Sequence, residues 1–215
     1  MTAAVSAARA ARLVLWDFDG VIKESVDVKT RAFVRLFEAY GTSVTARVRA
    51  HHEANGGMSR VEKMPIYLGF AGEPPDETRV RTLCDRFGAL VRQAVIDAPW
   101  VPGAESWLRR NEHGQLFVLV SATPQAELEE IVGALNLRHC FADVFGAPTS
   151  KADAVRFSLA RYGMAPQSAV LIGDARADRD AAADARVPFI LRRHASNGEV
   201  FADYDGPAVR DLTEL

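Results

Sequence analysis

The strongest constraint on the fold is the alternation of short apolar runs with stretches of helical character between residues 115 and 191. Apolar strands that alternate with helices are typical of a parallel sheet covered by helices on both faces. The runs are LFVLVS (116–121), DVFGA (143–147), AVLIGD (169–174) and VPFIL (187–191), and the helical stretches are 124–137, 151–162 and 177–186. We therefore expect an α/β fold.

A further apolar strand, LVLWDF (13–18), lies before these runs. The segment between it and the next strand has roughly 95 residues and is too long for a single crossover connection. This gap has a helical pattern throughout, at FVRLFEAY (33–40), 45–54, 60–70 and 77–97. We predict that residues 1–22 and 98–215 form the core and that residues 23–97 form a helical insert. Phe33, Phe37 and Tyr40 are expected in the hydrophobic interior of the insert.

Two carboxylates end the first strand. Asp17 and Asp19 are separated by one aromatic residue and followed by Gly20. Burying ionised carboxylates costs free energy unless a positive partner is present. The acids therefore either open a solvated turn, which Asp and Gly favour, or face a cation.

Polar residues also occur where later strands end. Ser121 ends the second strand, Asp174 follows AVLIG, Asp178 comes about one helical turn later, and Lys151 begins a helix. Ligands of open parallel sheets bind beyond the carboxyl ends of the strands. Each residue alone is common in turns and caps, but their joint order favours one site, and short acids suit Mg²⁺.

Composition excludes several classes of function. The net charge of −2 and the absence of a basic run argue against nucleic acid or an anionic membrane as the main partner. The chain has no run of signal-peptide or membrane-spanning character. Cys84 and Cys140 do not form a C-x-x-C pattern. We therefore expect reduced thiols and a cytoplasmic protein.

Taken together, the motifs resemble those of the haloacid dehalogenase-like hydrolase superfamily, in its phosphatase type with a helical cap, as in the phosphoglycolate phosphatase-like and β-phosphoglucomutase-like branches. The motifs that carry the resemblance are DFDGV (17–21), VLVSAT (118–123), PTSKAD (148–153) and IGDARAD (172–178). The resemblance implies a Rossmann-like parallel sheet in the order 5-4-1-2-3. It also implies an α-helical cap inserted after the first motif.

The same resemblance implies roles for the two opening carboxylates. Asp17 would attack phosphorus and form an aspartyl-phosphate. Asp19 would protonate the leaving alcohol and then activate water to hydrolyse that intermediate. Departure of a halide needs no proton, and the dehalogenase branch lacks an acid at the position of Asp19. Phosphoryl chemistry is therefore favoured over dehalogenation.

The implied metal and phosphate sites share residues with this catalytic set. A hydrogen bond from Ser121 and the positive charge of Lys151 would stabilise the phosphoryl group. Asp178 would bind the metal directly or orient a metal-bound water. The catalytic residues are Asp17, Asp19, Ser121 and Lys151; the phosphate-binding residues are Asp17, Ser121, Ala122 and Lys151; the Mg²⁺ ligands are Asp17, the backbone carbonyl of Asp19, Asp174 and Asp178.

The insert contains a candidate substrate contact. GMSR (57–60) is similar to the specificity loop of helical-cap relatives, in which an arginine reaches the substrate. This resemblance implies that Arg60 contacts the substrate. Lys63 is a second candidate, although it could instead be solvated. Ser59 and Glu62 also fit a capping box, so the segment could simply begin a helix.

Some conspicuous residues are not expected to belong to the site. His51 and His52 lack partners at ligand spacing and are not expected to bind a metal. Residues 192–194 (RRH) are expected to form a solvated loop. Glu24 occupies a position where many relatives carry aspartate, which leaves the hinge of the insert undefined.

The sequence thus predicts a Mg²⁺-dependent phosphatase that hydrolyses a small phosphorylated metabolite, either a sugar phosphate or a phosphoglycolate-like acid. A sugar phosphomutase is an alternative, because such enzymes keep both aspartates. A non-catalytic metabolite-binding or regulatory module is another, although the complete set of site residues counts against it. The oligomeric state is not predicted.

Overall fold

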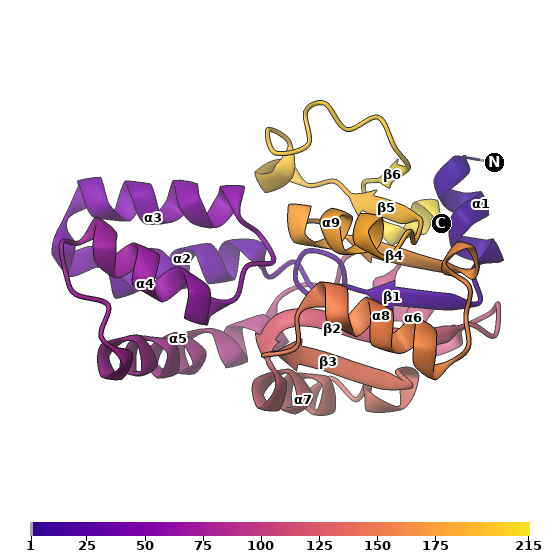
Figure 1. Cartoon of the computed structure of the whole chain (residues 1–215), viewed down its shortest axis with the longest axis horizontal. Helices are drawn as coiled ribbons and strands as arrows, with labels where there is room; N and C mark the ends of the chain where they lie inside the picture. Colours follow the sequence, from indigo (N-terminus) through magenta and orange to yellow (C-terminus); the bar gives the residue numbers. More distant parts are fainter. Residues whose placement is uncertain (1) are drawn as a thin grey trace.

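A computed structural model describes residues 2–215 as a six-stranded parallel sheet with helices on both faces (Figure 1). The strand order is β3-β2-β1-β4-β5-β6, so the first five strands have the predicted order and β6 extends the edge beyond β5. The predicted Rossmann-like α/β fold is confirmed. The strands are β1 (Leu13–Trp16), β2 (Leu116–Pro124), β3 (Asp143–Ala147), β4 (Ala169–Gly173), β5 (Phe189–Arg192) and β6 (Ala208–Val209).

Strand β1 lies at the centre of the sheet and is buried on both faces. It pairs with β2 on one side and with β4 on the other. Val14 and Trp16 face one hydrophobic cluster, whereas Leu13 and Leu15 face a second. Burial on both faces explains why this strand is a continuous apolar run rather than an alternating one.

The two clusters correspond to two layers of helices. On the Leu13 face pack α8 (Lys151–Arg161) and α9 (Arg176–Asp184). On the Trp16 face pack α1 (Ala3–Ala10), α6 (Ala104–Arg110) and α7 (Gln125–Ala134). The sequence patterns did not predict α1, α6 or β6, which are all short.

The inserted segment forms a helical unit beside the carboxyl ends of the strands (Figure 1). Its elements are α2 (Val26–Leu36), a 3₁₀ turn (Glu38–Tyr40), α3 (Thr42–Ala54), α4 (Arg60–Phe70) and α5 (Glu77–Asp97). We propose that it acts as a cap domain spanning residues 23–97. Within residues 2–215, no helix is both long and apolar enough to cross a membrane.

Aromatic side chains form the interior of this helical unit. Phe33 stacks on Phe87 with ring centroids 4.0 Å apart, and it meets the edge of Tyr67 at 5.3 Å. Phe37 is fully buried, as predicted. The expectation for Tyr40 was wrong, because this residue is 39% exposed. It lies in the 3₁₀ turn that follows α2 rather than on the helix itself.

The segments that enter and leave the helical unit run side by side. The Glu24 amide donates to the Pro99 carbonyl at 2.8 Å, and the Val101 amide donates to the Ile22 carbonyl at 3.0 Å. The Glu24 carboxylate also accepts a hydrogen bond from Arg192 Nη1 at 3.0 Å. Glu24 therefore ties the start of the insert to the end of β5, and Arg192 is buried rather than solvated.

Candidate active site

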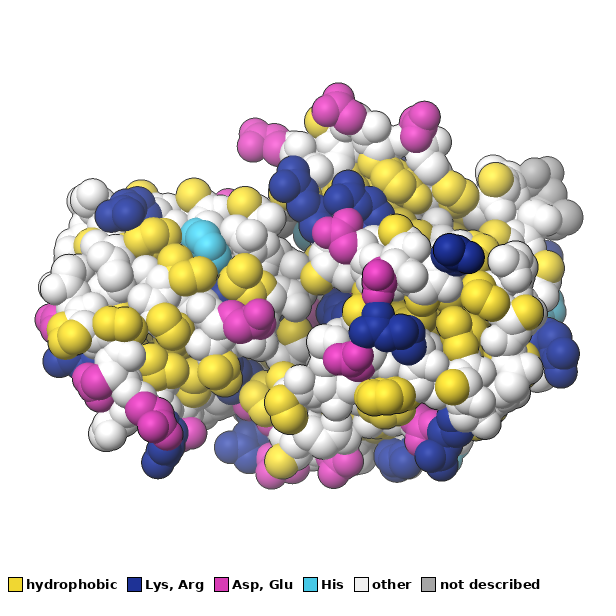
Figure 2. Space-filling model, viewed as in Figure 1, with side chains coloured by type: hydrophobic (Ala, Val, Ile, Leu, Met, Phe, Trp, Pro, Cys, Tyr) yellow, Lys and Arg dark blue, Asp and Glu magenta, His cyan; other side chains and the backbone are white. Residues whose placement is uncertain are grey.

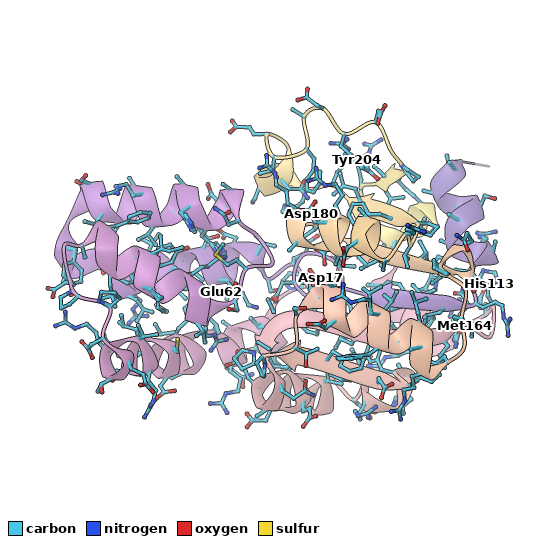
Figure 3. The ribbon with its side chains drawn as sticks, viewed as in Figure 1. Asp17, Glu62, His113, Met164, Asp180 and Tyr204 are labelled. Carbon is cyan, nitrogen blue, oxygen red and sulfur yellow. The ribbon has the colours of Figure 1, made fainter. Side chains whose placement is uncertain are left out.

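Three of the four predicted catalytic residues, Asp17, Asp19 and Lys151, line a pocket at the carboxyl edge of the sheet that faces the helical unit. Asp17 follows β1 directly, at the end of the strand nearest that unit (Figure 3). Its backbone amide donates to the Ile172 carbonyl at 3.0 Å, which continues the pairing of β1 with β4. In Figure 2, the surface is hollowed where the helical unit meets the rest of the chain.

The turn after Asp17 requires glycine at position 20. Gly20 has a φ of +75°, and a Cβ atom there would overlap the Asp174 carboxylate. The Gly20 amide donates to the Lys23 carbonyl at 2.8 Å, which closes the turn. The glycine of DFDGV therefore allows the first strand end to approach the fourth closely.

Three buried carboxylates and one ammonium group form a cluster at this pocket, which Asp17, Asp174 and Lys151 line. Asp17, Asp174 and Asp178 each offer an oxygen within 4.8 Å of the others. Lys151 Nζ lies 2.9 Å from Asp17 Oδ1 and 2.6 Å from Asp178 Oδ1. The cluster thus has more acids than cations.

Burial and mutual repulsion make this cluster suited to a divalent cation. Burial, followed by the charge of Asp178, raises the pKa of Asp17 to about 7 despite the opposing charge of Lys151. Burial also raises the pKa of Asp174 and that of Asp178. A hard cation would relieve this repulsion, and its preferred ligands are oxygens like those present here.

Asp19 lies in a different electrostatic environment from Asp17. Ser25 Oγ donates to Asp19 Oδ1 at 2.6 Å, and Lys29 forms an ion pair with the other carboxylate oxygen. Burial alone would raise the pKa of Asp19, but the charge and hydrogen bond of Lys29 outweigh it and hold that pKa below its ordinary value. Lys29 and Ser25 therefore hold Asp19 in its anionic form.

His194 supports the Asp174 side chain. Its Nε2 lies 2.8 Å from Asp174 Oδ2, and Asn197 Nδ2 donates to the Asp174 backbone carbonyl at 2.9 Å. The prediction of a solvated loop at residues 192–194 was therefore wrong here. After β5 the chain turns back over the end of β4, which places His194 against a carboxylate 20 residues earlier in the sequence.

The end of β2 contributes the predicted phosphate-binding segment. Ser121 is buried, and its Oγ accepts a hydrogen bond from the Thr123 amide at 3.2 Å. Ala122 and Thr123 line the pocket. Thr123 Oγ1 also accepts a hydrogen bond from Lys29 Nζ at 3.0 Å, which connects this strand end to the partner of Asp19.

Both predicted cap residues line the same pocket, but their hydrogen-bonding partners differ. The Arg60 guanidinium forms a bidentate ion pair with Glu127 of α7, at 2.8 and 2.6 Å. Lys63 Nζ lies 2.7 Å from His52 Nδ1. Ser59 and Glu62 also form the capping box that begins α4. Arg60 thus connects the helical unit to the core, whereas Lys63 faces the pocket without a carboxylate partner.

Sequence reasoning did not assign Lys29, His52, Thr123, His194 or Asn197 to this pocket. Lys29 lies one helical turn after Ser25, so its spacing could have indicated that it reaches Asp19. His52 and His194 had no comparable signal, because their partners are on other elements.

Comparison with known proteins agrees with this geometry. Residues 11–186 match the model of the haloacid dehalogenase-like hydrolase family. The chain belongs to this family. The predicted family and the predicted enzyme class are thereby confirmed.

Individual relatives share the fold at low sequence identity. A phosphoglycolate phosphatase of Pseudomonas putida is 23% identical over 95% of this chain and 78% of its own length. A β-phosphoglucomutase structure from Clostridium difficile has a TM-score of 0.77 at 20% identity, covering 95% of this chain and 93% of that one. CbbY from Rhodobacter sphaeroides, solved with xylulose 1,5-bisphosphate, has a TM-score of 0.76 at 18% identity, covering 95% and 96%.

Proposed function

We propose that this protein is a Mg²⁺-dependent phosphatase that hydrolyses a small phosphorylated metabolite, a sugar phosphate or a phosphoglycolate-like acid, through an aspartyl-phosphate. The main support is the contrast between its two opening carboxylates. Asp17 belongs to an acid cluster with Lys151, whereas Asp19 is held separately by Ser25 and Lys29. One carboxylate is thus suited to attack and the other to proton transfer.

In the first half of the reaction, an oxygen of Asp17 attacks phosphorus and the ester oxygen leaves. The new bond joins Asp17 to phosphorus, and the bond that breaks joins phosphorus to the alcohol. Lys151, 2.9 Å from Asp17, offsets the charge that gathers there. The leaving oxygen takes a proton from Asp19, so Asp19 must first gain a proton and separate from Lys29 when substrate binds.

In the second half, Asp19 is already in the form that the chemistry needs. As an anion it accepts a proton from water, and that water attacks the phosphorus of the aspartyl-phosphate. Asp17 leaves as a carboxylate and inorganic phosphate forms. Lys29 stabilises the anion that Asp19 becomes after it protonates the leaving oxygen, so this ion pair favours the first half of the reaction.

The residues that would hold Mg²⁺ are Asp17, Asp174, Asp178 and the backbone carbonyl of Asp19. When bound, the ion would supply positive charge that lets a phosphate dianion approach these carboxylates. His194 and Asn197 would hold Asp174 in place for this purpose.

The names of the relatives support the substrate class. Phosphoglycolate, the substrate of β-phosphoglucomutase and xylulose 1,5-bisphosphate are all small phosphorylated molecules. They differ in what lies beyond the phosphate.

A screen of phosphorylated metabolites with Mg²⁺ tests the proposal. We expect release of inorganic phosphate from at least one compound, no release in chelator, and none from Asp17→Asn under the same conditions. Isomerisation of a sugar phosphate that depends on a bisphosphorylated activator would identify a mutase instead. Failure to act on any phosphoester would identify a non-catalytic module.

A further inference from the structure

Lys63 is a buried cation in the pocket wall whose charge no carboxylate balances. Its side chain is 1% exposed and lines the same pocket as Asp17 and Asp174. The only hydrogen-bonding partner of its Nζ within residues 2–215 is His52 Nδ1, at 2.7 Å. An isolated buried ammonium group is costly, so this arrangement needs an explanation.

The other buried cations of the pocket wall are all paired with carboxylates. Lys29 pairs with Asp19, Lys151 with Asp17 and Asp178, and Arg60 with Glu127. Arg60, the cap residue that the motif suggested, is therefore already neutralised by a residue of the core. Lys63 is the buried cation of this wall that remains available for an incoming anion.

His52 orients Lys63 but does not neutralise it. Burial and the charge of Lys63 lower the pKa of His52 well below its ordinary value, so its imidazole is neutral and accepts a hydrogen bond from the ammonium group. The apolar ring of Phe33 covers the pair, with its centroid 5.6 Å from Nζ. Phe33 and Phe87 line this part of the pocket and supply no counter-charge.

We propose that Lys63, oriented by His52, binds a second anionic group of the substrate, at the end remote from the transferred phosphoryl group. This inference rests on the proposed phosphatase function and narrows its substrate class. Because Lys63 and Asp17 line one pocket, both anionic groups belong to one small molecule. The substrate is a phosphate monoester that carries a carboxylate or a second phosphate on a short carbon skeleton.

The kinetic test compares substrates that differ in the second group only. We would measure phosphate release from 2-phosphoglycolate and 1,2-ethanediol bisphosphate, with ethyl phosphate as the counterpart that lacks a second anionic group. Lys63→Met should lower kcat/KM about tenfold or more for the preferred compound with two anionic groups, and change it for ethyl phosphate by about twofold at most. Comparing 2-phosphoglycolate with 1,2-ethanediol bisphosphate shows whether the second group is a carboxylate or a phosphate.

Arg92→Gln provides the matched control. Arg92 is a cation of the same helical unit, on α5, but it pairs with Glu130 at the surface and does not line the pocket. Its loss should leave the preference for a second anionic group unchanged. Equal losses in the two variants would mean that Lys63 acts only through the general charge of the cap, which would overturn the proposal.

A binding measurement separates this inference from the proposed function. Titration calorimetry with Mg²⁺ would compare phosphonoacetate, which has no ester to hydrolyse, with ethylphosphonate. If the second group is a carboxylate, phosphonoacetate should bind more tightly than ethylphosphonate, and Lys63→Met should remove the difference. If the second group is a phosphate, methylenebisphosphonate should show this Lys63-dependent preference instead. Hydrolysis of ethyl phosphate without any preference for a second anion would overturn the Lys63 assignment and leave the phosphatase standing. Lys63-dependent binding without hydrolysis of any ester would overturn the phosphatase and leave the anion site standing.

Discussion

Replacing Lys63 with methionine should make the protein more stable, because it removes an uncompensated buried charge. Burial, with the charge of Lys29 as a second cause, lowers the pKa of Lys63 from 10.5 to about 7. One pKa unit corresponds to about 1.36 kcal/mol, so the ammonium group destabilises the fold by at most about 5 kcal/mol. Methionine has a similar length and no charge.

Two losses offset this gain. The hydrogen bond from Lys63 to His52 contributes about 1 kcal/mol, and leaving His52 Nδ1 unpaired costs about 1 to 3 kcal/mol. We therefore expect Lys63→Met to raise the free energy of unfolding by about 2 kcal/mol at pH 6.5. For a chain of this size, that corresponds to a rise in Tm of roughly 4 to 8 °C.

The gain should depend on pH in a defined direction. The unfolded chain keeps the Lys63 proton up to pH 10.5, whereas the folded chain loses it near pH 7. Unfolding therefore takes up a proton between these values, and the stability of the natural protein rises with pH across that window. The advantage of Lys63→Met is fully present below pH 7, shrinks as pH rises, and reverses before pH 10.5, where only the loss of the hydrogen bond to His52 remains.

Chemical denaturation at pH 6.5 and at pH 10, without metal or ligand, would measure this difference. Arg92→Gln, which breaks an exposed ion pair, should change stability by less than about 1 kcal/mol at pH 6.5. A Lys63→Met protein that is less stable than the natural one at pH 6.5 would refute the reasoning. An advantage that is equal at both pH values would refute it as well.

The remaining predictions concern the reaction and the contact between the two parts. Chelation should abolish phosphate release and added Mg²⁺ should restore it, whereas Asp174→Asn should raise the Mg²⁺ concentration needed for half-maximal activity. Asp17→Asn should abolish turnover yet stabilise the chelated protein above pH 7 in thermal denaturation, because the raised pKa of Asp17 makes its anion destabilising once the pH exceeds the unfolded value of 3.8. Asp19→Asn should retain more activity on esters with good leaving groups, measured as the ratio of kcat for an aryl and an alkyl phosphate. Glu127→Gln should lower the free energy of unfolding by about 3 kcal/mol, since it leaves Arg60 buried and unpaired.

The core of the site could be predicted from the sequence because backbone topology determines it. Asp17 and Asp174 directly follow buried parallel strands, and the carboxyl ends of neighbouring strands must meet. Gly20 is needed by the turn itself, since any side chain there would overlap Asp174. Such positions follow from local patterns, so four short motifs were enough to predict them.

Ion pairs between residues far apart in the sequence could not be predicted in the same way. Arg60 pairs with a glutamate 67 positions later, and Arg192 pairs with Glu24 across 168 positions. These contacts depend on how the helical unit packs on the core and on where the chain turns after β5. Neither is encoded in a local pattern, which is why residues 192–194 were wrongly expected to be solvated.

The positions of the few lysines indicate where the pocket lies, although the motif analysis did not use them. The chain has 26 basic residues, and only Lys23, Lys29, Lys63 and Lys151 are lysines. Lys23 is buried at the hinge, and the other three line the pocket. The buried arginines Arg60 and Arg192 each form an ion pair with a glutamate, whereas a lysine ammonium group is a compact point charge. Lys63 thus lines the pocket together with Lys29 and Lys151, which both contact catalytic carboxylates. In our proposal, the substrate supplies the negative charge that Lys63 lacks.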